Sequence, residues 1–280
     1  NGIYAFAIWD GAKNQLALYR DRLGIKPLFY SIKDNMLVFG SEPKALFCHP
    51  KVPAEINIDS LREIFGVGPA RTPGCGVFKD VFELLPGHYM VFTKEGLGNY
   101  KYWELEVKGH KDDYKKTVEK VSFLVRDAIR RQMVSDVPVC SFLSGGIDSS
   151  IVTAVASDYL QKTGAVLNTF SFDFKDNDTF FSANAFQPER DRPFVDLMKK
   201  EYPVNHTYLE CDEEKLVQFL YKSVDAKDLP GMADVDASLL YFCSLVVKHN
   251  KVALTGECAD EIFGGYPWFY RPEMLNKGFF

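Results

Sequence analysis

The sequence lacks the features that mark secreted, membrane-spanning and nucleic-acid-binding proteins. Its six cysteines are scattered, with no Cys-x-x-Cys pair. A disulfide framework or a zinc cluster is therefore not expected, and a reducing cytoplasm fits best. No apolar run reaches the roughly 18 residues of a membrane-spanning helix. The formal net charge is −5 and no block of Lys or Arg occurs, so neither a nucleic acid nor a membrane is expected as a partner.

What is present is the composition of an ordinary globular protein, with 280 residues, 46% of them hydrophobic and 25% charged. A chain of roughly 300 residues can bury about three quarters of its unfolded surface, enough for one large or two modest cores. The pattern of apolar residues changes near the polar stretch 107–113, which reads as a linker. We therefore predict two domains, residues 1–106 and residues 107–280.

The first region has the pattern of paired antiparallel strands. Alternating runs flank short turn signals such as Asp10-Gly11, which is typical of β-hairpins. The predicted strands are 3–9, 15–20, 28–32, 36–39, 87–93 and 100–105, the last two joined by a turn at 94–98. Short helices are predicted at 43–47 and 58–65.

The second region alternates between strands and helices, which indicates a parallel sheet with right-handed crossovers. The predicted strands are 139–143, 166–172, 205–209 and 252–255, and the predicted helices are 114–133, 151–159, 194–201, 215–224 and 238–249. Ligands bind such sheets outside the carboxyl ends of the strands. Arg126, Arg130 and Arg131 in the first helix are better explained as its solvated face than as a phosphate site.

A glycine-rich turn, Ser144-Gly-Gly-Ile-Asp-Ser-Ser150, follows the strand 139–143. The two glycines allow a sharp turn and a close backbone approach, and we expect the serines to cap the following helix. Backbone N–H groups at such a turn suit a phosphate, and Asp148 suits Mg2+ beside it. This is not the Walker loop, because the turn holds no lysine. The alternative is an ordinary turn into a helix.

A second glycine-bearing turn, Leu254-Thr-Gly-Glu-Cys-Ala-Asp-Glu-Ile-Phe-Gly-Gly-Tyr266, follows the strand 252–255. Gly256 allows close backbone approach. Glu257 and Asp260 are three residues apart, which places them on one side if the segment is helical. A pair of carboxylates is usually a solvated helix start, but these two lie at the mouth of the same predicted sheet as Asp148.

These stretches resemble a known family. The turn at 144–150 is similar to the pyrophosphate loop (PP-loop) of ATP pyrophosphatases, and 255–266 resembles the corresponding segment of asparagine synthetases. Residues 1–10, 20–30, 40–46 and 84–89 resemble the later part of an N-terminal-nucleophile (Ntn) glutaminase domain. The resemblance as a whole is to glutamine-hydrolysing, class B asparagine synthetases. It implies an α/β chain: the antiparallel-β part of an Ntn-type glutaminase domain, then a parallel-sheet α/β PP-loop nucleotide-binding domain.

The resemblance also implies cofactors and residue roles. It implies ATP, with Mg2+ held by Asp148 and Asp260, and the side chain of Glu257 as the group that takes the surplus proton. The residues implied to contact ATP are Phe142, Leu143 and Phe172 at the adenine, Ser144, Gly145, Gly146, Ser149 and Ser150 at the phosphates, and Thr255 and Gly256 near the AMP moiety. For each aromatic residue, a plain core position is an equal alternative. The implied substrates are aspartate or another carboxylic acid, with ammonia or glutamine; homodimerisation stays open.

The chain also departs from the family pattern. Residue 1 is Asn, where the glutaminase chemistry needs an N-terminal cysteine, so we expect that this chain alone does not hydrolyse glutamine and that it is truncated at both ends. Cys75 is better explained as an inert thiol than as a substitute nucleophile. A family lysine beyond the last motif has no counterpart here.

Another departure concerns the acid. Asp236 stands where the family often has arginine, and an aspartate repels a substrate carboxylate that an arginine would bind. This favours two alternatives to asparagine synthesis: a related enzyme that acts on a different acid, or a chain that binds ATP without turnover. The stretch 176–192 is either a mobile loop near the acyl site or an ordinary surface insertion.

Overall fold

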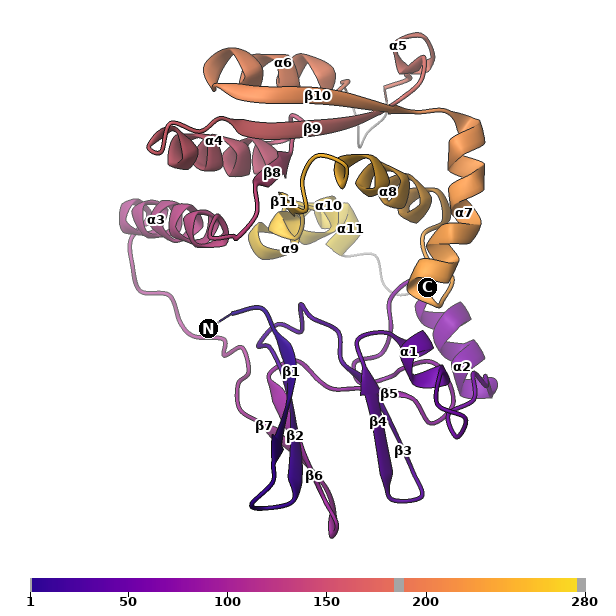
Figure 1. Ribbon diagram of the computed structural model, residues 1–280. Helices are drawn as coiled ribbons and strands as arrows, with labels where there is room; N and C mark the ends of the chain where they lie inside the picture. The colour runs from indigo at the N-terminus through magenta and orange to yellow at the C-terminus, as the bar shows by residue number, and fades with distance from the viewer. Residues whose placement is uncertain (1, 184–188, 276–280) are drawn as a thin grey trace. The chain divides into compact units, whose positions relative to one another are not determined.

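The computed structural model describes residues 2–183 and 189–275 (Figure 1). It divides into two compact units, Asn1–His110 with Leu220–Ala237, and Lys111–Phe219 with Ser238–Phe280. The antiparallel and parallel parts of the fold class predicted above are both confirmed. The domain boundary between residues 106 and 107 stays a prediction, and the sequence pattern does not anticipate that 220–237 joins the first unit.

The first unit contains two antiparallel sheets. One has the strand order β1-β2-β6-β7, and the other has the order β4-β3-β5. Their bounds are β1 Ala5–Asp10, β2 Gln15–Arg20, β3 Phe29–Lys33, β4 Met36–Gly40, β5 Phe82–Glu83, β6 His88–Thr93 and β7 Gly96–Lys101. The buried side chains of Leu18, Leu28, Leu84 and Met90 form one core. Phe29, Leu46, Val52 and Val81 form another, under α1 (Pro43–Phe47).

Two predictions for the first unit are wrong in detail. The strand predicted at 100–105 begins at Gly96, because Thr93 pairs with Gly96 and leaves only Lys94 and Glu95 in the turn. Gly96 has φ +136°, a backbone conformation that glycine permits. The helix predicted at 58–65 is α2 (Ile58–Arg62), which continues as the π-helical turn η1 (Glu63–Val67).

The second unit is built on one parallel sheet with the order β10-β9-β8-β11. Its strands are β8 Val139–Phe142, β9 Leu167–Phe174, β10 Val204–Cys211 and β11 Val252–Leu254. Its helices are α3 Tyr114–Gln132, α4 Ile147–Gln161, α5 Asn177–Phe180, α6 Arg192–Glu201, α9 Ala259–Phe263, α10 Pro267–Tyr270 and α11 Pro272–Leu275. The chain passes between the units through α7 Glu213–Lys227 and α8 Ala233–Val246.

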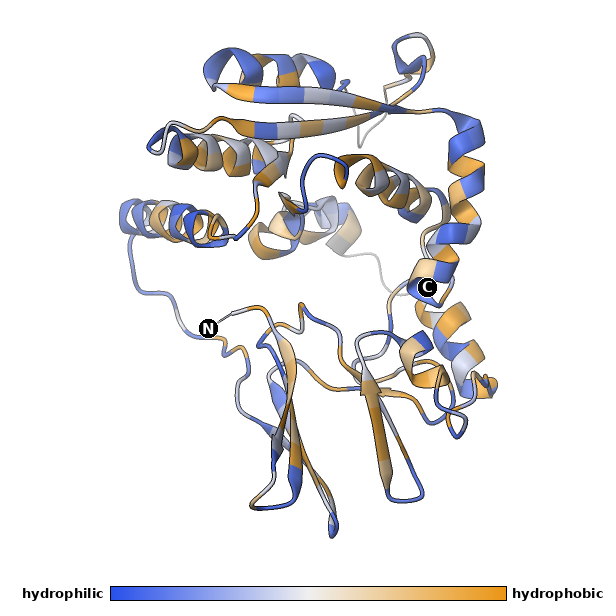
Figure 2. Ribbon diagram, in the orientation of Figure 1, coloured by the Kyte–Doolittle hydropathy of each residue, from blue (hydrophilic) through white to orange (hydrophobic). Residues whose placement is uncertain are grey.

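Alternation along the strands gives this sheet two apolar faces. Val139 and Leu167 pack with Ile129 of α3 and Val155 of α4. Cys140 and Phe170, which lie on the opposite face of the same two strands, form the other core with Phe242 and Val246 of α8. In Figure 2 the bands of hydrophilic and hydrophobic colour along α3 match a helix that buries one side. Among the described helices even α3, the longest, lacks the apolar stretch that a membrane crossing requires.

Two helices of the second region begin a full turn or more before their predicted starts. α4 starts at Ile147 rather than 151, inside the glycine-rich turn, so Asp148 and Ser149 occupy its first helical turn. α8 starts at Ala233 rather than 238, which places Asp236 in its first turn. Both helix starts lie in stretches of small or polar residues, whose composition alone favours turns. Packing of the residues that follow extends the helices into these stretches.

Candidate nucleotide-binding site

The glycine-rich turn lies between the end of β8 and the start of α4, at the carboxyl ends of the parallel strands. Gly145 has φ +85°, and a Cβ there would stand 2.7 Å from the Cβ of Phe194 and 2.8 Å from the carbonyl oxygen of Asp191. Both contacts are with the first turn of α6 or its N-cap. Glycine is therefore required twice, for its backbone conformation and for the close packing of the loop on α6.

The serines hold the loop in a different way from the one predicted. The N-cap of α4 is Gly146, and no side chain caps the helix there. Instead, Ser149 Oγ accepts from the backbone N–H of Ser144 at 3.2 Å and donates to the carbonyl of Gly146 at 3.1 Å. The predicted serine cap is wrong. Ser149 lies in the first turn of α4 and its hydroxyl bonds hold the loop closed. No capping side chain therefore occupies the N–H groups at the start of α4.

Two carboxylates from distant segments meet beside this loop. The pKa of Asp148 is raised above its ordinary value, first by burial and then by the negative charge of Asp260. A Cβ on Gly256 would lie 2.7 Å from the backbone nitrogen of Ser149 and 2.9 Å from the Cβ of Asp148. The turn after β11 thus packs directly on the loop after β8, and it brings Asp260 close enough to repel Asp148.

This pair fits a divalent cation. Mg2+ is usually held by one or two carboxylates together with phosphate oxygens and water, and a cation between Asp148 and Asp260 would remove their repulsion. Residues 2–183 and 189–275 contain no cluster of three or more His, Cys, Asp or Glu side chains arranged for a metal. A site of two carboxylates completed by a substrate is consistent with that finding.

The turn after β11 leads into α9, and its candidate site residues lie on both sides of the start of that helix. Cys258 adopts φ +68° as the residue before α9, so Glu257 lies in the turn and only Asp260 lies on the helix. Thr255 and Glu257 are exposed. The charge of Glu257 reaches α8, where burial first and then Glu257 raise the pKa of the Cys243 thiol.

An aromatic cavity of about 170 Å³ lies at the ends of β8 and β9. The rings of Phe142 and Phe172 lie 4.6 Å and 5.5 Å from the ring of Phe242 on α8. The cavity is lined by Phe142, Leu143, Ser144, Phe170, Ser171, Phe172, Asp173, Asp191, Arg192, Val195, Tyr208 and Phe242. Phe142 and Phe172 pack against the core and also line the cavity, so the two alternatives left open for them are not exclusive.

The sequence reading did not single out Arg192 and Tyr208 in this cavity. The guanidinium of Arg192 stands 4.5 Å from the centre of the Tyr208 ring. Burial and a hydrogen bond to Asp196 raise the pKa of Tyr208 to about 12. The signal that could have found Tyr208 is its place near the carboxyl end of a predicted strand. No local signal marks Arg192, because α6 begins two residues before the predicted start.

Asp236 lies in the first unit, where its carboxylate is already bonded. It accepts from Lys227 Nζ at 2.6 Å and from the backbone N–H of Met232 at 2.7 Å. Burial alone would raise the pKa of Asp236, but these two donors lower it on balance. The Asp236 carboxylate therefore holds the segment before α8 in place, and the ammonium of Lys227 compensates its charge.

The stretch 176–192 begins with α5 and contains an ion pair between Arg190 and Asp178. Residues 184–188 of this stretch lie outside the described residues. Its assignment as a mobile loop or as a surface insertion therefore stays open.

Comparison with known proteins covers both regions. Residues 120–280 match the family model "Asparagine synthase", and residues 1–103 match "Glutamine amidotransferase domain". The chain is 49% identical to asparagine synthetase [glutamine-hydrolyzing] 3 of Bacillus subtilis, over all of this chain and 45% of that protein. It is 31% identical to putative asparagine synthetase [glutamine-hydrolyzing] 2 of Methanocaldococcus jannaschii, over 99% of this chain and 52% of that protein.

A relative with a different name is amidase chry2 of Gibberella zeae, at 30% identity over 99% of this chain and 41% of that protein. The chain spans about half the length of the curated relatives it matches. The resemblance found in the two glycine-bearing turns is confirmed by these matches. Since the asparagine synthase model covers more than half of its residues, the chain belongs to the asparagine synthase family.

Proposed function

We propose that the protein containing this chain uses ATP to activate the side-chain carboxylate of aspartate and then converts it to an amide, forming asparagine. The observation that carries this proposal is the meeting of Asp148 and Asp260 beside a glycine-rich loop, at the carboxyl ends of a parallel sheet. Such an arrangement suits a nucleotide triphosphate with its cation. The family match supplies the class of reaction.

In this proposal the described residues bind ATP in two parts. Adenine enters the cavity formed by Phe142, Leu143 and Phe172, where flat apolar walls favour a ring. The phosphates lie on the backbone of Ser144 to Gly146 and on the N-terminal turn of α4 with Ser149 and Ser150. Thr255 and Gly256 approach the AMP moiety. Arg192 supplies positive charge that the loop, without a lysine, does not hold.

Asp148 and Asp260 would hold Mg2+. When bound, the ion supplies charge neutralisation for the phosphates and for the departing pyrophosphate. Without it, two neighbouring carboxylates would repel the triphosphate. The raised pKa of Asp148 is consistent with a site whose charges are balanced by ligands rather than by the protein.

The chemistry assigned to the chain's own groups is positioning and proton transfer. A carboxylate is a poor acyl donor because its leaving group would be oxide. Its oxygen attacks the α-phosphorus, pyrophosphate leaves, and the acyl-AMP is held with the loop N–H groups on the phosphate. Ammonia then attacks the acyl carbon, AMP leaves, and Glu257, exposed in the turn after β11, takes the surplus proton.

The source of nitrogen and the acid belong to the proposal as well. The amidotransferase match over residues 1–103 supports ammonia from glutamine in the whole protein. Aspartate remains the proposed acid, because Asp236 is bonded to Lys227 and its charge is not left to repel a substrate. The cytoplasmic location and the lack of nucleic-acid and membrane partners stay predictions.

The test is ATP–pyrophosphate exchange with Mg2+, comparing L-aspartate with other carboxylic acids. We expect exchange that depends on aspartate and is lost in Asp148→Ala. A matched control is Asp158→Ala, which removes a carboxylate from the later part of the same helix. Exchange with another acid only would make the protein a related amide-forming enzyme. Tight ATP binding with no exchange for any acid would support binding without turnover and reject the proposal for this chain.

A further inference from the structure

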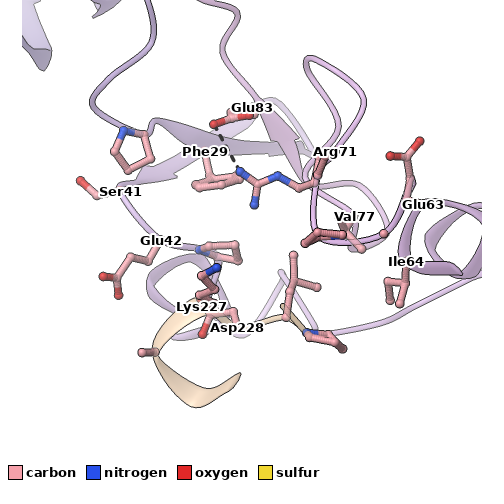
Figure 3. Close-up of a pocket in the computed structure, with 18 residues that line it drawn as sticks. Phe29, Ser41, Glu42, Glu63, Ile64, Arg71, Val77, Glu83, Lys227 and Asp228 are labelled. Atoms are coloured by element: carbon pink, nitrogen blue, oxygen red, sulfur yellow. Dashed lines mark ion pairs between the residues drawn. The ribbon is translucent and has the colours of Figure 1, made fainter. Parts of the chain in front are cut away.

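A second cavity, of about 430 Å³, lies in the first unit and is lined by none of the residues assigned to ATP (Figure 3). Its walls come from β3, the end of β5, the start of α1, η1 and the segment 226–230. The volume falls in the range of pockets for small molecules, roughly 300–1,000 Å³. It therefore has room for a small ligand.

Arg71 is the polar group available to such a ligand. Figure 3 shows its guanidinium pointing into the cavity near the ring of Phe29, and the distance to that ring is 5.1 Å. Its nearest carboxylate oxygen, Glu83 Oε1, lies 3.7 Å away and is engaged by Arg20 at 2.9 Å. No residue that the structure describes accepts a normal hydrogen bond from Arg71. A guanidinium with unused donors presents a fork that matches a carboxylate.

The surroundings hold Arg71 and the cavity walls in place. The carboxylate of Glu63 accepts from the backbone N–H and hydroxyl of Thr72 at 2.9 Å and 2.7 Å. This bond closes the segment next to Arg71 onto η1, and π-helical turns are frequent at functional sites. On another wall, Asp228 accepts from the backbone N–H of Lys44 at 3.0 Å and pairs with its ammonium at 3.2 Å. Because these bonds already hold the cavity walls in place, little free energy is lost to ordering the walls when a ligand binds.

The charges around the cavity decide the class of ligand. Glu42, Glu63, Glu83 and Asp228 line it, together with the cations Arg71 and Lys227. Lys44 pairs with Glu42 and Asp228, and Arg20 pairs with Glu83. Glu63 is therefore the lining carboxylate that has no ion pair among the described residues. Lys227 is already paired with Asp236. A bare anion would match Arg71 alone, whereas a zwitterion also brings a cation for Glu63.

We propose that this cavity binds a free α-amino acid, with its carboxylate on Arg71 and its ammonium toward Glu63. Ile64, Val77 and Pro69 offer apolar surface for the amino acid's side chain. The cavity shares no lining residue with the site assigned to ATP, so the inference does not depend on the proposed reaction.

The test is isothermal titration calorimetry of the chain with a panel of L-amino acids that includes aspartate, asparagine, glutamine and leucine. Propionate and ethylamine, which carry only one of the two charges, are the control ligands. We expect at least one amino acid to bind with millimolar affinity or better, and neither control ligand to bind comparably. Arg71→Ala should weaken binding at least about tenfold, and Arg71→Lys should weaken it less because the charge remains without the fork.

Two control variants separate this site from others. Arg62→Ala removes an exposed arginine of the same unit that pairs with Asp59, and it should leave amino-acid binding unchanged. Asp148→Ala should remove nucleotide exchange and also leave amino-acid binding unchanged. The proposal is overturned if no amino acid binds, if propionate binds equally well, or if binding survives Arg71→Ala unchanged.

Discussion

Asp21 and Asp148 are both partly or fully removed from water, yet their surroundings treat the negative charge in opposite ways. Asp21 is 1% exposed and accepts from the backbone N–H groups of Tyr4, Leu23, Ile25 and Lys26. Burial alone would raise its pKa, but these donors lower it on balance. Asp148 has a raised pKa, caused by burial and by Asp260. A carboxylate whose charge is stabilised by hydrogen bonds from the protein has a structural role. A carboxylate whose charge the protein destabilises indicates a bound ligand.

The largest expected effect is a loss of stability when the structural carboxylate, Asp21, is removed. Asp21→Ala leaves four partly buried backbone N–H groups without their acceptor, and an unsatisfied donor costs roughly 1–3 kcal/mol when it is fully buried. Allowing for water entry, we expect the free energy of unfolding to fall by about 4 kcal/mol, measured by urea denaturation. Asp10→Ala is the matched control, because its two backbone hydrogen bonds lie in an exposed turn. A loss no larger than that of the control would contradict the structural role.

The pH dependence of that loss has a definite sign. The folded pKa of Asp21 lies below its unfolded value of about 3.9. The stability it contributes is therefore fully present above the unfolded pKa and is lost as the pH falls through the folded pKa. The difference between wild type and Asp21→Ala should be constant near neutral pH and should shrink in acid.

The next effect tests whether the two turns must meet. Gly256→Ala places a Cβ 2.7 Å from the backbone nitrogen of Ser149, so the turn after β11 has to move away from the loop and carry Asp260 with it. We expect ATP–pyrophosphate exchange to fall about 100-fold, the size seen when one positioned transition-state contact is lost. Gly109→Ala, where nothing lies within 4 Å of the added Cβ, is the control. Unchanged exchange would show that this close approach is not needed.

A smaller effect is expected at Arg192, the cation of the nucleotide cavity. Arg192→Ala should weaken ATP binding about tenfold, or ~1.4 kcal/mol, and should leave adenosine binding nearly unchanged, because the side chain is assigned to the phosphates. Lys200→Ala removes an exposed cation from the same helix and serves as the control. Equal losses for ATP and adenosine would mean that Arg192 contacts the base instead.

These residues also show what a sequence can predict. The sequence predicts that Asp148 and Asp260 lie close together, because each lies in a glycine-bearing turn after a strand and the carboxyl ends of parallel strands converge. Arg192 was missed because its position depends on how α6 packs against Gly145, a tertiary contact that leaves no periodic trace. Asp236 was identified, but its partner Lys227 lies nine residues earlier and is brought close only by the turn ahead of α8. The serine cap failed because the hydroxyl of Ser149 has two competing uses, and the chain uses it to close the loop.

The smallest expected effect is a gain in stability rather than a loss. It concerns Asp148, where stability and ligand binding are expected to change in opposite directions. Because the folded pKa of Asp148 is raised, its ionised form destabilises the fold, and this penalty is present above the folded pKa and vanishes below the unfolded pKa. Asp148→Asn should therefore stabilise the nucleotide-free protein at neutral pH, by less than about 1 kcal/mol. The gain should disappear near pH 3, where the wild-type carboxyl is neutral as well. Adding ATP with Mg2+ should reverse the order, because only the wild type gains stability from a ligand that balances the charge. Thermal unfolding of both proteins, with and without MgATP, measures the two signs together. A variant less stable than wild type without nucleotide would mean that Asp148 has partners in the fold, and it would then belong with Asp21 rather than with the ligand site.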